Sequence, residues 1–223
     1  MTSASKGRDE VYCGTAKHLL TSGHRDLRGP AGSSGRPGGE GNRGVTTVSS
    51  YCDRSAAQVF RPWGDLAYYA RLQNGGLENG ISPWLLRGGA SVVSGNEPYF
   101  ISGNRGDSNS LLLPQGSTAY TGFVCFTITD WHLRFVMRNV GSSTGALRVQ
   151  VVVPDFLGGL LTVLDGGTVR GSGTWAPSPR ILLPLTNVAW LIGTRAVAFR
   201  FTPVGRNAAY QIDDAHLDPW KST

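Results

Sequence analysis

Two adjacent carboxylates interrupt a stretch near the end of the chain that otherwise has the pattern of a half-buried strand. In YQIDDAHLDPW, Ile212 shares a strand face with Asp214, whereas Leu217 shares a face with Asp213. The apolar side of the strand therefore changes at the Asp pair. Three explanations are open: the strand bulges there, both of its faces are covered, or a cation offsets the placement of the charges.

Arginines form a second set of residues that could bind a ligand, along two apolar runs, HLRFVMRNV and ALRVQVVV. The turn-rich GSSTG between the runs predicts a hairpin that places Arg138 nearly opposite Arg148. Like charges so placed repel, and an anionic partner would relieve the repulsion because arginine binds carboxylates and phosphates with two N–H groups. An anion-binding face and an ordinary solvated face both remain open. The residues concerned are Arg134, Arg138, Arg148, Gln150 and, if RAVAFRFTP lies in the same sheet, Arg200.

The sequence gives weaker signals for catalytic residues than for these two sets. The chain has four histidines, HExxH does not occur, and His132 and His216 lie on predicted strands without an adjacent serine motif. Carboxylate pairs for glycoside cleavage can be drawn from several positions, but nothing selects one pair. We therefore expect a protein that is not an enzyme.

The composition favours an all-β scaffold for these residues. Glycine is abundant (31 of 223 residues) and the charged fraction is low (16%), which suits short strands joined by tight turns. At least eight short apolar runs follow Tyr51 with no long amphipathic helix between them. We predict an antiparallel β-sandwich, a jelly roll, over residues 51–220.

Residues 1–50 differ from the rest of the chain, with ten glycines, few large apolar residues and the run GPAGSSGRPGGEGNRG. Such a segment buries too little apolar surface to offset the entropy of ordering it, so we predict a disordered tail. No signal peptide is recognisable in it. No apolar stretch approaches the roughly 18 residues of a membrane span, and the net charge of +6 does not indicate a nucleic-acid partner.

The two ends of the predicted sandwich resemble a known family. NGGLENGISPW, from Asn74 to Trp84, is similar to the stretch with which carbohydrate-binding-module-like jelly rolls of the galactose-binding-like superfamily often begin, and YQIDDAHL is similar to their last strand. With Cys52 before VFRPWGD, the chain most resembles a group of secreted bacterial proteins built on that jelly roll. The resemblance covers about residues 52–220, and its specific motifs lie at the two ends.

The resemblance implies a structural calcium ion between the first and last strands. A carboxylate of the N-terminal motif and one of the C-terminal Asp residues often hold such an ion, which here gives Glu78 with Asp213 or Asp214, and Asp107 is a further candidate. Ca²⁺ prefers six to eight oxygen ligands, and it would offset the charges of the Asp pair. The alternative is that the pair accepts hydrogen bonds from backbone amides or contacts an arginine.

The resemblance also implies a non-catalytic binding module for carbohydrate or an anionic cell-wall polymer. Sugar-binding jelly rolls use exposed aromatic rings as platforms, and we expect Trp175 and then Tyr99 to serve here, with Trp63 and Trp84 in the core. A secreted or cell-surface monomer is expected, which requires that the start of the sequence be misassigned. The alternatives are a structural or adhesive surface protein without sugar binding and a polysaccharide lyase or hydrolase of the same fold.

Three cysteines are present, without CxxC spacing or a nearby metal-site histidine. Cys52 opens the region predicted to fold and Cys125 lies in an apolar run, so we predict a disulfide between them, with Cys13 left over. Reduced thiols in an intracellular protein are the alternative.

Overall fold

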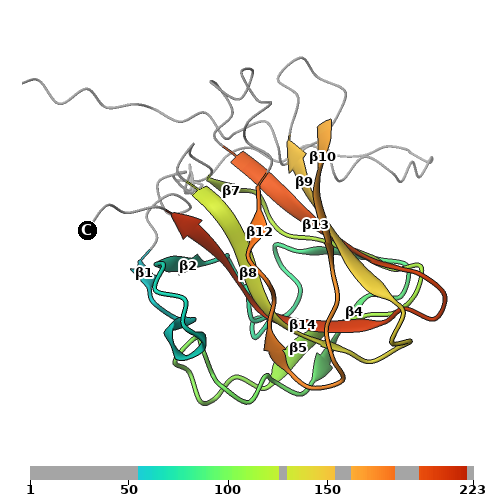
Figure 1. The fold of residues 1–223 in the computed structure, drawn as a ribbon, viewed down its shortest axis with the longest axis horizontal. Helices are drawn as coiled ribbons and strands as arrows, with labels where there is room; N and C mark the ends of the chain where they lie inside the picture. Colours follow the sequence, from blue (N-terminus) through green and yellow to red (C-terminus); the bar gives the residue numbers. More distant parts are fainter. Residues whose placement is uncertain (1–54, 126–129, 154–161, 184–195, 220–223) are drawn as a thin grey trace, which may run out of the picture.

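Two antiparallel sheets face each other in the computed structural model, which describes residues 55–125, 130–153, 162–183 and 196–219 (Figure 1). Apart from one 3-10 turn, η2 (Arg61–Trp63), the regular structure of these residues is β. The predicted all-β antiparallel sandwich is confirmed, while the segment predicted to be a disordered tail lies outside the described residues. Within these ranges, no helix has the length and apolar character needed to cross a membrane.

Sheet A has eight strands and is organised around the last one. β14 (Tyr210–Pro219) pairs along its length with β8 (Asp130–Asn139), and also with β5 and β2. The beginning and the end of the described fold therefore lie side by side, as the resemblance implies. The other strands of the sheet are β1 (Ala56–Ala57), β2 (Tyr69–Arg71), β4 (Ser91–Ser94), β5 (Asn109–Leu113), β11 (Ala176–Pro177) and β12 (Ile181–Leu182).

Sheet B has six strands and forms the second layer (Figure 1). Its strand order is β10-β9-β13-β6-β3, and β7 pairs with β13. The bounds are β3 (Leu85–Arg87), β6 (Thr118–Tyr120), β7 (Val124–Cys125), β9 (Ala146–Val153), β10 (Thr162–Val169) and β13 (Ala196–Val204).

The predicted hairpin of β8 with β9 is wrong, because the two strands lie in different sheets. Residues 140–145 carry the chain from one layer to the other, and the backbone N–H groups of Val140 and Ser142 donate to the carbonyls of Ala209 and Asn207 at 2.9 and 2.8 Å. Both runs turn an apolar face inward. Two runs of alternating apolar and polar residues joined by a short turn can pair within one sheet, or they can lie in two sheets that pack face to face. The alternation alone does not distinguish the two arrangements.

Apolar side chains fill the space between the sheets, and a second, smaller cluster lies on the outer face of sheet A. Phe135 and Met137 of β8 belong to the main core, whereas Val136, which points the opposite way, packs with Phe60 and Tyr69. Val136 is the one apolar residue that breaks the alternation of this strand. The residues around 59–69 and Ile101 therefore cover part of the outer face of sheet A.

The Asp pair forms a bulge in β14. Asp213 pairs with Val136 and His216 with Arg134, so β14 has one residue more than β8 over this interval. Asp214 has a φ of 45°, in the left-handed region that Asp adopts more readily than most residues. The extra residue returns Ala215 to the core face. A bulge at the Asp pair, one of the three explanations for why the apolar side of the strand changes there, is therefore confirmed.

Candidate binding site

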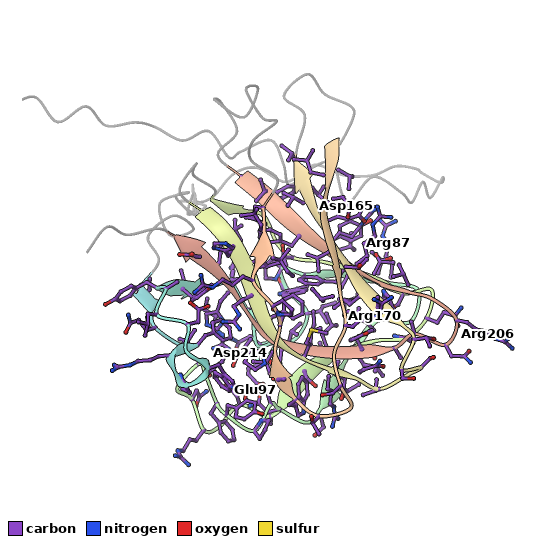
Figure 2. All side chains as sticks on the ribbon, in the orientation of Figure 1. Arg87, Glu97, Asp165, Arg170, Arg206 and Asp214 are labelled. Carbon is purple, nitrogen blue, oxygen red and sulfur yellow. The ribbon has the colours of Figure 1, made fainter. Side chains whose placement is uncertain are left out.

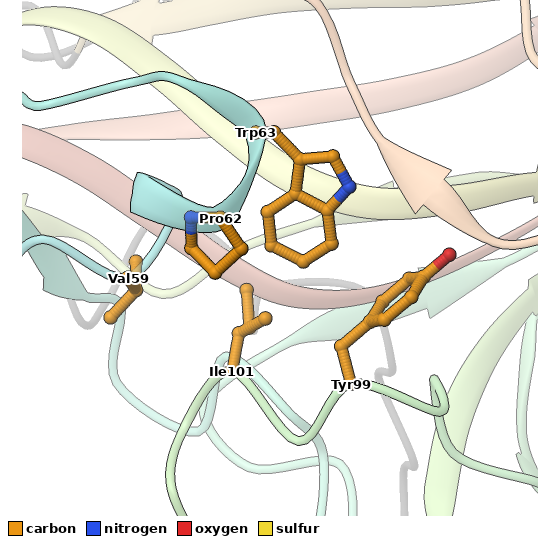
Figure 3. A pocket seen from close by; sticks show the side chains of 5 residues that line it. All are labelled: Val59, Pro62, Trp63, Tyr99 and Ile101. Carbon is orange, nitrogen blue, oxygen red and sulfur yellow. The ribbon is translucent and has the colours of Figure 1, made fainter.

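A pocket opens on the outer side of sheet A, where the rings of Trp63 and Tyr99 meet (Figure 3). Val59, Pro62 and Ile101 complete its lining, and its volume is about 440 Å³. The two aromatic residues are 37% and 44% exposed, and their ring centroids are 4.8 Å apart with the planes at 83°. Two exposed rings over an aliphatic floor offer a surface that the apolar face of a ligand can cover.

The local sequence RPWG presents Trp63 at the surface. Pro62 lies in the first positions of η2, where its missing N–H costs nothing, and Gly64 ends the turn with a φ of 78° and donates to the carbonyl of Arg61 at 2.9 Å. Phe60, just before the turn, is fully buried. The turn is thus held from below while the indole of Trp63 faces outward.

Asp65 fixes this segment to sheet A. Its buried carboxylate accepts hydrogen bonds from Tyr69 Oη at 2.8 Å, Arg134 Nη1 at 2.5 Å, the backbone N–H of Ala67 at 3.1 Å, and Arg180. Burial alone would raise the pKa of Asp65, but the hydrogen bonds outweigh it and lower the pKa to about 2. Asp65 is therefore ionised and ties the Trp63 turn to strands β2 and β8.

Glu97 fixes the opposite wall of the pocket. It is fully buried, and its two carboxylate oxygens accept the backbone N–H groups of Tyr99 at 2.5 Å and Ile101 at 2.7 Å. The hydroxyl of Tyr99 donates to the backbone carbonyl of Trp175 at 2.8 Å. Tyr99 is thus held at both ends, and the pocket wall is formed before a ligand arrives.

Asp213 in turn holds Glu97. Its carboxylate accepts the backbone N–H of Glu97 at 3.2 Å and that of Asp214 at 2.7 Å. Burial raises the pKa of Asp213 to about 8, and the neighbouring Asp214 carboxylate adds to the rise. Hydrogen bonding to backbone amides, one of the alternatives that the sequence left open, is therefore present.

Asp214 faces an arginine. Its Oδ1 lies 2.8 Å from Nη2 of Arg71, a residue of β2. Neither Asp214 oxygen has a well-aligned hydrogen bond within the described residues, so the contact is an ion pair rather than a directional hydrogen bond. Burial raises the pKa of Asp214 to about 6, and Arg71 opposes that rise. The cation offsetting this carboxylate is a guanidinium of the chain itself.

Two glycines lie close to this ion pair and to the bulge. A Cβ on Gly76 would lie 1.9 Å from Nη2 of Arg71 and 2.9 Å from Oδ1 of Asp214, and one on Gly75 would lie 2.6 Å from the carbonyl oxygen of Ala215. The chain here runs directly against the bulge of β14. Gly75 is therefore required by the close approach of the β14 backbone, and Gly76 leaves room for the side chains of the ion pair.

Glu78 lies next to this cluster without contacting the Asp pair. One of its oxygens accepts the backbone N–H groups of Ser108 at 3.0 Å and Asn109 at 2.7 Å, and the other accepts the side-chain amide of Asn109 at 3.0 Å. Glu78 thus joins its loop to the start of β5. These hydrogen bonds occupy the oxygens that the resemblance assigned to calcium.

Asp107 is a buried structural residue in its loop. It accepts hydrogen bonds from Ser102 Oγ at 2.6 Å and Asn104 Nδ2 at 2.5 Å and lies 3.4 Å from Nη2 of Arg71. Arg71 therefore brings Asp107 and Asp214 together. Within the described ranges, no group of three or more His, Cys, Asp and Glu side chains is arranged to hold a metal ion. The calcium ion stays a prediction that these contacts do not support.

The arginines that were expected to share one face lie on two sheets. On the outer face of sheet B, Arg200 donates through Nε to Oε1 of Gln150 at 2.8 Å, and Arg148 pairs with Asp165 at 3.0 Å. Figure 2 shows Asp165 on the opposite side of the view from Glu97 and Asp214.

On sheet A, the two remaining arginines have partners of their own. Arg134 contacts Asp65, and Arg138 donates to Gln211. Since β8 and β9 are not paired, the repulsion between Arg138 and Arg148 that suggested an anionic partner does not arise.

Trp175 supports the pocket instead of lining it. It is half-buried against the outer cluster of sheet A, its carbonyl holds Tyr99, and the guanidinium of Arg138 lies 4.9 Å from its ring centroid. Tyr99 is exposed and lines the pocket. Trp84 is buried as expected, but Trp63 is not in the core, because η2 turns it outward.

The predicted disulfide falls largely outside the described residues. Cys13 and Cys52 belong to the undescribed N-terminal part, and for Cys125 only the backbone is described, where it pairs with Ala196. The bridge between Cys52 and Cys125 stays a prediction.

No family model matches the chain, and the comparison with curated proteins found no relative. Similar solved structures include the CBM22-1 xylan-binding domain of Paenibacillus barcinonensis Xyn10C, at 15% identity and a TM-score of 0.46, over 67% of this chain and 94% of that one. TmCBM61 in complex with β-1,4-galactotriose has 16% identity and a TM-score of 0.40, over 67% of this chain and 98% of that one. The family 11 module of Clostridium thermocellum with a mixed-linked tetrasaccharide has 15% identity and a TM-score of 0.38, over 69% of this chain and 96% of that one. These neighbours are carbohydrate-binding modules, and similarity at this level does not define a ligand for this chain.

Proposed function

We propose that this chain is a non-catalytic carbohydrate-binding module that holds a sugar against Trp63 and Tyr99. The observation that carries the proposal is the pair of exposed rings at the mouth of a pocket with an aliphatic floor. The C–H faces of a pyranose are apolar, and covering them with aromatic rings removes both surfaces from water.

The supports beneath the rings favour binding over a chance surface feature. Asp65 anchors the Trp63 turn, and Glu97 anchors the loop of Tyr99 and Ile101. A site whose walls are held before binding loses less conformational entropy when the ligand arrives. The buried carboxylates of Asp65 and Glu97 thus hold the exposed rings of Trp63 and Tyr99 in place, which suits the binding of a ligand.

The location that accompanies this function is the cell surface or the surrounding medium, where polysaccharides are accessible. Neutral polysaccharides fit the pocket better than an anionic wall polymer, because none of its five lining side chains is charged. The anionic polymer remains a candidate only for the arginines on sheet B.

Affinity electrophoresis in gels containing xylan, β-1,4-galactan, mixed-linked β-glucan or a polysaccharide rich in fucose or rhamnose tests the proposal, with calorimetry on any polysaccharide that retards the protein. We expect retardation by at least one polysaccharide, and about tenfold weaker binding for Trp63→Ala and for Tyr99→Ala, since one aromatic contact contributes about 1.4 kcal/mol. Tyr68→Ala is the matched control, because Tyr68 is 36% exposed but does not line the pocket.

Three outcomes would overturn the proposal. Unretarded migration in every polysaccharide would favour a structural or adhesive surface protein. Equal retardation of wild type and Trp63→Ala would place the binding surface elsewhere. Release of sugar products during the incubation would point to a lyase or hydrolase instead of a binding module.

A further inference from the structure

We propose that the pocket selects sugars that carry a methyl group, with 6-deoxyhexoses as the simplest case, over the corresponding fully hydroxylated sugars. This inference rests on the proposed function and specifies the ligand class of the same site. It follows from the chemistry of the pocket lining, taken group by group.

The floor of the pocket has no hydrogen-bonding side chain. Val59, Pro62 and Ile101 are aliphatic, and Figure 3 shows Ile101 between the ring of Tyr99 and the side chains of Val59 and Pro62. Among the lining side chains, only the indole N–H of Trp63 and the hydroxyl of Tyr99 can form hydrogen bonds. The Tyr99 hydroxyl already donates to the carbonyl of Trp175 at 2.8 Å.

Three backbone N–H groups of the lining, those of Trp63, Tyr99 and Ile101, are also engaged. The N–H groups of Tyr99 and Ile101 donate to Glu97, and that of Trp63 donates to the carbonyl of Phe60 at 3.0 Å. Pro62 has no N–H. A ligand hydroxyl that reached the floor would therefore lose its water and meet few groups able to replace it.

The ring geometry is compatible with a sugar substituent that lies against this floor. Because the planes of Trp63 and Tyr99 stand at 83°, a pyranose stacked on one ring turns its edge toward the other ring. The exocyclic C6 group lies on the edge of a hexopyranose. A methyl group at C6 would be buried favourably against Ile101, whereas a hydroxymethyl group would bury an unpaired hydroxyl.

The expected preference is about tenfold to hundredfold, the range found when an apolar pocket discriminates against an added hydroxyl or buries one without a partner. Calorimetric titration of the full chain with matched pairs measures it: L-fucose against L-galactose, L-rhamnose against L-mannose, and 6-deoxy-D-glucose against D-glucose. We expect the deoxy member of at least one pair to bind tenfold tighter or more.

Ile101→Thr tests the floor directly, because threonine keeps the branched shape and adds a hydroxyl. We expect the preference for the deoxy member to fall below about threefold in this variant. Val163→Thr is the matched control, since Val163 is 39% exposed and does not line the pocket, and it should keep the wild-type preference. Thermal melts of both variants show whether they are folded.

The outcomes separate this inference from the proposed function. If the hydroxylated sugars bind as tightly as their deoxy partners and Trp63→Ala weakens binding about tenfold, the site is a sugar site and the methyl preference is wrong. A deoxy preference that survives in Ile101→Thr also contradicts the inference. If no sugar or polysaccharide binds at all, both conclusions fall together.

Discussion

Glu97 and Asp213 are joined by a 3.2 Å hydrogen bond from the backbone N–H of the first to the carboxylate of the second, across 116 positions of the sequence. Glu97 in turn orients the backbone of Tyr99 and Ile101. The bulge of β14 therefore positions one wall of the candidate site, although Asp213 does not line the pocket.

Replacing Asp213 by alanine should destabilise the protein and weaken ligand binding together. Two buried N–H groups, those of Glu97 and Asp214, would lose their acceptor, which costs about 1–3 kcal/mol of unfolding free energy. Asp213→Asn keeps one acceptor oxygen and should cost less. Urea denaturation at pH 7 measures the loss of stability in both variants, and equal losses would contradict the role of this carboxyl group as the shared acceptor.

Asp65 should make stability depend on pH in the acid range. Its folded-state pKa of about 2 lies below the ordinary value of 3.8, so its stabilising contribution is complete above about pH 4 and is lost as the pH falls toward 2. Asp65→Asn should therefore cost about 2 kcal/mol at pH 7, with a smaller difference from wild type near pH 2.

Asp165→Asn is the control for this pH series. Asp165 also pairs with an arginine, but the side chains of Asp165 and Arg148 are 52% and 43% exposed, and solvent screens such exposed pairs so that they contribute little to stability. Urea denaturation at pH 7, 4 and 2.5 follows both variants. A pH-independent loss in Asp65→Asn would show that the ionised carboxylate is not the stabilising form.

Gly76→Ala should break the ion pair between Arg71 and Asp214. The added Cβ would lie 1.9 Å from Nη2 of Arg71, which must move away and leave a buried carboxylate without its cation. We expect a loss of about 2 kcal/mol or more. Gly173→Ala is the control, since its Cβ would meet nothing closer than 3.9 Å.

A double-mutant cycle separates this mechanism from general crowding. If the cost of Gly76→Ala comes from displacing Arg71, adding it to Arg71→Ala should cost little more than Arg71→Ala alone. Full additivity of the two losses, measured by urea denaturation, would show that the alanine acts through the backbone instead.

Chelation tests the calcium ion that the sequence motifs imply. An ion bound only to the folded state would stabilise it, so EDTA at matched ionic strength would lower the Tm and excess CaCl₂ would restore it. An unchanged Tm would contradict the calcium prediction and leave Arg71 as the charge that offsets Asp214.

The sequence predicted the sandwich but not the pairing of its strands. Alternation in HLRFVMRNV and ALRVQVVV identified two strands with one buried face each, which is a local property of the chain. Whether consecutive strands pair or cross between layers depends on contacts elsewhere, such as those of Val140 and Ser142 with residues 207–209. For that reason β8 and β9 were assigned to one hairpin and lie in separate sheets.

The site was predictable only in part, for a related reason. Tyr99 was selected from its loop context and does line the pocket, whereas the core position predicted for Trp63 rested on its place in a segment that resembles the family. The RPWG turn was the available signal for its outward direction. Arg71 carried no local signal at all, because its partner Asp214 lies in the last strand.

The position of β14 also constrains how the polypeptide acquires its fold during translation. This strand joins β8, β5 and β2, so the ribosome must release its last residues before sheet A can close. Until then the nascent chain exposes unpaired strand edges that invite association with other chains. Sheet A therefore stays open to such association until β14 has left the ribosome and paired with its neighbours.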